Sequence, residues 1–157
     1  MRSLPGTGQA GLVHCIELPP IAESVAAARK GTRAILESQG LSHLVGDAIL
    51  LVSELVSNVV RHAHGDGSPL GLRVIPSGTT LRIEILDTDP RPPTPRIPGP
   101  LDASGFGFVL VEAIADDWGV SQTSTGKAVW IELQISPEAR REEPRQWSGT
   151  RVSAPAH

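Results

Sequence analysis

The residues best suited to chemistry lie between Leu44 and His64, where a carboxylate and an amide are one helical turn apart. Glu54 and Asn58 are four positions apart, and Asp47 and Arg61 fall on the same face of the expected helix. A carboxylate beside a neutral amide suits a base next to a metal or phosphate ligand. The alternative is an ordinary solvated face, and the spacing alone does not separate the two.

A pair of glycines, Gly105 and Gly107, precedes an apolar helical run. Glycines at a helix start let backbone N–H groups approach a phosphate, although a plain loop entering a helix has the same pattern. The segment from Pro90 to Pro100 carries six prolines, so it predicts a long lid-like loop. A dinucleotide-binding fingerprint requires a strand directly before its glycines, and the proline-rich segment stands there instead, so that motif is disfavoured. No P-loop motif occurs.

Other candidate groups are weaker. Asp87 follows an alternating apolar strand, where its carboxylate could accept a hydrogen bond from an exocyclic amine or simply form a turn. His62, His64 and Asp66 have poor spacing for a metal on one helical face. The chain has no G-x-S-x-G motif, so covalent hydrolase chemistry has no support.

The elements that must position these residues follow from the period of the apolar residues. Helical spacing predicts helices at 21–40, 44–64 and 108–117. A short apolar run predicts an edge strand at 12–18, and alternation predicts strands at 70–74, 81–85, 118–123 and 128–135, with a hairpin turn at Pro76–Gly78. This order predicts a two-layer α+β sandwich: a mainly antiparallel mixed sheet with helices on one face.

Length and composition place these elements in one domain. The chain has 157 residues and a net charge of -3, which argues against a nucleic-acid partner. We expect a flexible N-terminus over residues 1–11, a folded domain over 12–136 and a disordered tail over 137–157. Cys15, the single cysteine, is expected in the core. We expect no run long enough to span a membrane, and hence a cytoplasmic protein.

The motifs together resemble the Bergerat-fold, or histidine kinase-like, ATPase superfamily, closest to small bacterial anti-sigma-factor serine/threonine kinases. ELVSNVVRHA resembles its N box, LDTDPRPP its first glycine box, SGFGFVLVEAIADDWGV its second glycine box and GKAVWIEL its closing strand. Two features depart from the pattern. Asp89 and Arg91 replace glycines of the first box, and Ala128 stands where a threonine is frequent.

The resemblance implies a role for each matched residue. Glu54 would be the general base, and Asn58 would hold Mg²⁺. Asp87 would bind the adenine amine. The remaining implied contacts to ATP come from Arg61, His62, Gly105 and Gly107, the two glycines through backbone amides at the phosphates.

The activity implied is transfer of the ATP γ-phosphate to a serine or threonine of an anti-anti-sigma-like protein, in the regulation of transcription. A sigma factor and a second copy of the chain are further implied partners. An alternative of another class is a module that binds nucleotide or partner without phosphoryl transfer, which the altered first glycine box favours. A purely structural interaction protein would require every motif to be a coincidence.

Overall fold

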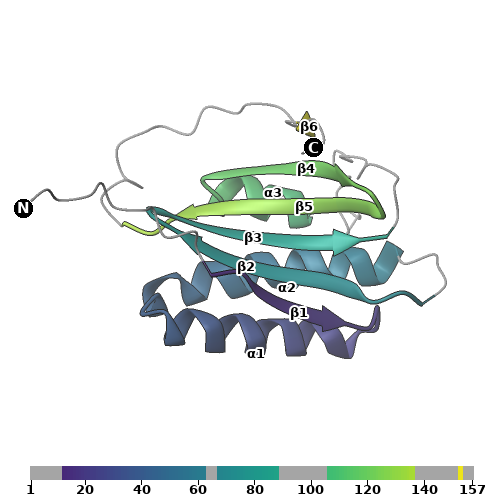
Figure 1. Ribbon diagram of the computed structural model, residues 1–157, viewed down its shortest axis with the longest axis horizontal. Coiled ribbons are helices and arrows are strands. Elements are labelled where there is room, and N and C mark those ends of the chain that lie inside the picture. Colours follow the sequence, from purple (N-terminus) through teal and green to yellow (C-terminus); the bar gives the residue numbers. More distant parts are fainter. Residues whose placement is uncertain (1–11, 63–66, 89–105, 137–151, 154–157) are drawn as a thin grey trace, which may run out of the picture.

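The computed structural model describes residues 12–62, 67–88, 106–136 and 152–153. One sheet has the strand order β1-β2-β3-β5-β4-β6, with antiparallel neighbours except for the parallel pair β4 and β6. Figure 1 shows α1 and α2 side by side along one side of this sheet. The elements are β1 His14–Leu18, α1 Glu23–Ser38, the 3-10 turn η1 Ser42–Leu44, α2 Val45–His62, β2 Leu70–Ser77, β3 Thr80–Asp87, α3 Phe106–Ile114, β4 Asp117–Thr123, β5 Gly126–Gln134 and β6 Val152–Ser153. The predicted two-layer α+β sandwich is confirmed.

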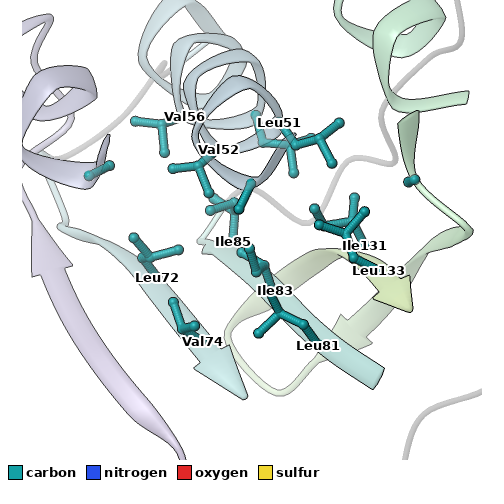
Figure 2. Packing of buried hydrophobic residues seen from close by; sticks show 14 of the residues in the cluster. Leu51, Val52, Val56, Leu72, Val74, Leu81, Ile83, Ile85, Ile131 and Leu133 are labelled. Atoms are coloured by element: carbon teal, nitrogen blue, oxygen red, sulfur yellow. The ribbon is translucent and has the colours of Figure 1, made fainter. Parts of the chain in front are cut away.

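The core lies between the sheet and the helices. Figure 2 shows Val52 and Val56 of α2 directed towards apolar side chains of the central strands, among them Ile83 and Ile85 of β3. All four are fully buried. The apolar period of the sequence therefore decides which side of α2 meets the sheet, and this leaves its polar side directed away from the core.

The first helix ends where the sequence predicted. Ala28, Thr32 and Leu36 repeat at helical spacing and are fully buried. Gly40 follows with a φ of 70°, a left-handed conformation that favours glycine. The N–H of Leu41 then donates to the carbonyl of Leu36 at 2.8 Å, which closes the helix end.

Two predicted boundaries are corrected. Pro76 lies inside β2, paired with Leu81, and is not part of the turn. Proline is tolerated there because β1 pairs with β2 only as far as Val74, so no neighbour on that side needs a backbone donor. Asp117 begins β4 and does not end the preceding helix, which stops at Ile114.

The sheet face opposite the helices is covered by a charged network. The guanidinium of Arg82 lies 4.2 Å from the ring centroid of Trp130. Arg82 also bonds Glu84 at 2.8 Å and Glu132 at 3.1 Å. Trp130 is buried although it points away from the helices, and Arg82 lies over its ring. The expectation that Cys15 lies in the core is wrong, because its register opposite Arg73 places it on this outer face, where it is exposed.

One stretch of the described chain, Ser42–His62, is long and apolar enough to cross a membrane by length and composition, with a mean hydropathy of 1.5. The expectation that no run reaches that length is corrected. In this fold Ala48, Val52 and Val56 of the stretch are fully buried in the core. Its packing against the sheet accounts for its composition.

Several expectations fall on residues that lie outside the described part of the chain. They concern segment 1–11, the proline-rich loop, Gly105 and most of segment 137–157. Within that last segment Val152 and Ser153 form β6, which pairs with Val120 and Ser121 of β4.

Candidate functional site

The polar face of α2 carries the pair that the sequence singled out. Glu54 and Asn58 lie one turn apart and are half-buried, whereas Arg61 and His62 are exposed at the end of the helix. The two half-buried groups lie on the same side of the helix as the fully buried Leu51, because positions 54 and 58 follow position 51 by one and two turns. The helix thus holds a carboxylate and an amide at the border of the core.

Neither group is engaged by a neighbour in the described part of the chain. Among the described residues, no hydrogen bond or ion pair involves the side chain of Glu54 or Asn58. Polar groups at the edge of a core are normally hydrogen-bonded to protein, water or a ligand. Their arrangement suits a ligand that engages both groups.

Asp87 occupies the last position of β3, on the sheet face that meets the helices. Its register partner on β5 is Lys127, and the Lys127 Nζ lies 3.7 Å from the Asp87 Oδ2. The two side chains are only 11% and 19% exposed, for Lys127 and Asp87 respectively. A carboxylate and an ammonium so largely removed from water stabilise each other, since either alone would be costly to bury.

A close backbone approach fixes these two strand ends. A Cβ built on Gly126 would lie 2.0 Å from the carbonyl oxygen of Asp87 and 2.7 Å from the Cα of Thr88. Only a residue without a side chain allows β5 to begin so near the end of β3. Gly126 therefore sets the positions of Asp87 and Lys127.

The chain connections bring the end of α2 to the same end of the sheet. β2 follows α2 in the chain, and Gly71, near the start of β2, pairs with Leu86 at the end of β3. Figure 1 shows the end of α2, the end of β3 and the start of β5 on one side of the molecule. Gly107 lies in the first turn of α3, which also packs against α2.

Reasoning from the sequence identified Asp87 but missed Lys127. The alternation that places Val129, Ile131 and Leu133 on the inner face continues back to position 127, so the signal was present. The register of β5 against β3 is what makes Lys127 the partner of Asp87, and no local pattern specifies it.

The donor groups fit magnesium held together with a nucleotide. In the described residues no group of three or more His, Cys, Asp and Glu side chains could hold a metal ion by itself. Mg²⁺ prefers oxygen ligands and is usually held by one or two protein oxygens together with substrate phosphates. The amide oxygen of Asn58 and the nearby carboxylate of Glu54 are groups of this kind.

Comparison with known proteins assigns this chain to a family. The family model for the histidine kinase-like ATPase domain matches residues 18–133. An uncharacterized protein of Streptomyces coelicolor is 42% identical over 91 residues, which cover 55% of this chain and 84% of that protein.

A solved structure has the same fold. The RsbU and RsbW domains of Rv1364c from Mycobacterium tuberculosis superpose with a TM-score of 0.61 at 16% identity. The match covers 78% of this chain and 32% of that one, so this chain spans about a third of the length of its structural relative. The Bergerat architecture expected from the sequence is thus confirmed, and the family match over most of the chain shows that this protein belongs to the histidine kinase-like ATPases.

Proposed function

We propose that this protein is a regulatory serine/threonine kinase that transfers the γ-phosphate of ATP to a partner protein. The observation that carries the proposal is the Glu54–Asn58 pair, half-buried on α2 with both polar ends unengaged by the described residues. A carboxylate in that place is not required to hold a nucleotide. It is required to accept the proton of an attacking hydroxyl group.

Each residue has a distinct part in this proposal. Asn58 would help to hold Mg²⁺, which supplies charge neutralisation at the phosphates when it is bound. Glu54 receives the hydroxyl proton, and Asp87 accepts a hydrogen bond from the adenine amine. Backbone amides at Gly105 and Gly107 would bind the phosphates, because the start of a helix favours negative charge. Arg61 and His62, exposed at the end of α2, would add polar contacts to the nucleotide.

The partners follow from the resemblance to anti-sigma-factor kinases. An anti-anti-sigma-like protein would be the phosphate acceptor, and a sigma factor would be a second ligand, in the cytoplasm. A second copy of this chain would complete a homodimer. The RsbW domain of the structural relative supports this choice within the wider family.

A second candidate is a module that binds nucleotide or partner without phosphoryl transfer. The observation that favours it is the altered first glycine box, where Asp89 and Arg91 replace glycines. Side chains at those positions restrict the close backbone approach that glycine permits.

A comparison of Glu54→Gln with Asn58→Ala separates the two candidates. Glu54→Gln should bind ATP within a few-fold of wild type but transfer phosphate about 10²- to 10⁴-fold more slowly, the usual effect of removing a general base. Asn58→Ala should weaken both binding and transfer. Calorimetry measures the affinity, and labelled ATP with Mg²⁺ and an extract of the source organism measures the transfer. Glu23→Gln, the same change on the exposed first turn of α1, is the matched control.

The outcomes are distinct. Undiminished transfer by Glu54→Gln would remove Glu54 from the mechanism. Wild-type protein that binds Mg·ATP but labels no protein in the extract would favour the binding module.

A further inference from the structure

We propose that Lys127 reads the nucleotide base together with Asp87, by donating a hydrogen bond to the ring nitrogen beside the adenine amine. This inference rests on the proposed function, because it assigns a specificity residue to the same nucleotide site. It concerns a side chain of this chain that the sequence motifs do not assign to the site.

The two groups face the same space. Asp87 and Lys127 are register partners on β3 and β5, and both side chains are on the inner face with Ile85 and Val129. A base whose amine meets Asp87 therefore comes within the reach of Lys127, because cross-strand partners are close neighbours.

The ion pair has a geometry that a ligand could share. At 3.7 Å, the separation of the Lys127 Nζ and the Asp87 Oδ2 exceeds a normal hydrogen bond. An ammonium has three donor protons, and a carboxylate accepts through two oxygens. The ion pair by itself therefore uses only part of the hydrogen-bonding capacity of either group.

The chemical match is to adenine. Its edge presents a donor, the exocyclic amine, directly beside an acceptor, the ring nitrogen. Asp87 supplies an acceptor and Lys127 a donor in the corresponding order. Guanine in the same orientation reverses both positions, since it presents a carbonyl oxygen to the carboxylate and an N–H group to the ammonium. A buried acceptor that faces an acceptor, or a buried donor that faces a donor, is strongly unfavourable. The pair therefore selects adenine over guanine.

The experiment pairs a ligand analogue with a protein variant. The ligands are ATP and 1-deaza-ATP, in which a C–H group replaces the ring nitrogen beside the amine. Wild-type protein should bind 1-deaza-ATP at least about 10-fold more weakly than ATP, the usual effect of losing a hydrogen bond from a charged donor. Lys127→Met keeps the length of the side chain and removes the donor, so this variant should bind the two ligands within about two-fold of each other.

The control is Lys30→Met, which removes the same charge from the exposed side of α1. It should keep the wild-type preference for ATP over 1-deaza-ATP. Thermal unfolding shows whether the variants fold, and the comparison of the two ligands on wild-type protein needs no variant at all.

Each result has one meaning. Equal binding of ATP and 1-deaza-ATP by the wild type overturns the role of Lys127 while leaving ATP binding itself intact. A preference for ATP that persists in Lys127→Met overturns it as well, because another group must then read the ring nitrogen. Absence of ATP binding by folded wild-type protein overturns the proposed function first.

Discussion

At the scale of the single residue, Asp87 and Lys127 are two charges largely removed from water, and each stabilises the other. Asp87→Ala should lower the free energy of unfolding by about 1–3 kcal/mol, because it leaves the Lys127 ammonium without this partner. The same change should weaken ATP binding by about 10- to 100-fold, the worth of a hydrogen bond to a charged group. Denaturant unfolding and calorimetry measure the two effects separately.

The double variant Asp87→Ala/Lys127→Met distinguishes stability from binding. It should recover much of the stability lost by Asp87→Ala, since both charges of the pair are then removed together, but should recover none of the ATP affinity. Recovery of both would mean that Asp87 acts on the nucleotide only by keeping the fold intact.

At the scale of the element, the start of β5 is defined by a glycine without room for a side chain. Gly126→Ala should destabilise the protein by about 2 kcal/mol or more, because the added methyl group meets the backbone of Asp87 and Thr88. The matched control is Gly46→Ala on the exposed side of α2, where a Cβ meets nothing within 4 Å. That change should stabilise the protein by about 0.5–1 kcal/mol. Equal melting temperatures for the two variants would contradict the close approach of β5 to β3.

Elements could be predicted from the sequence where the signal is local. The apolar stripe of α2 and the alternation in β3 and β5 specify both the type of element and its inner face. Predictions were wrong where the pairing between strands decided the outcome. Pro76 is tolerated in β2 only because β1 ends early, and Cys15 is exposed because pairing with β2 turns it outward. Glu54 and Asn58 could be identified because one helix holds both, whereas the pairing of Lys127 with Asp87 could not, because it depends on the register of two strands.

At the scale of the whole molecule, the residues beyond Ser136 contribute β6, two residues long, to the described structure. Truncation after Ser136 removes its pairing with Val120 and Ser121 of β4. We expect the melting temperature to fall by no more than about 4 °C, which corresponds to roughly 1 kcal/mol in a domain of this size. Differential scanning calorimetry of the full chain and the truncated chain tests this. A much larger fall would show that the removed segment is part of the folded domain.

The contrast between Gly126 and its neighbour Lys127 has a consequence for saturation mutagenesis. A library randomised at position 126 and sorted for folded protein should return almost only glycine, because any side chain meets the backbone of β3. A library at position 127 should also return uncharged residues in the same sort, at the stability cost of removing the ammonium beside Asp87, yet retain lysine when sorted for discrimination between purines. Two adjacent codons would then show opposite selection signatures, one imposed by folding and the other by ligand choice.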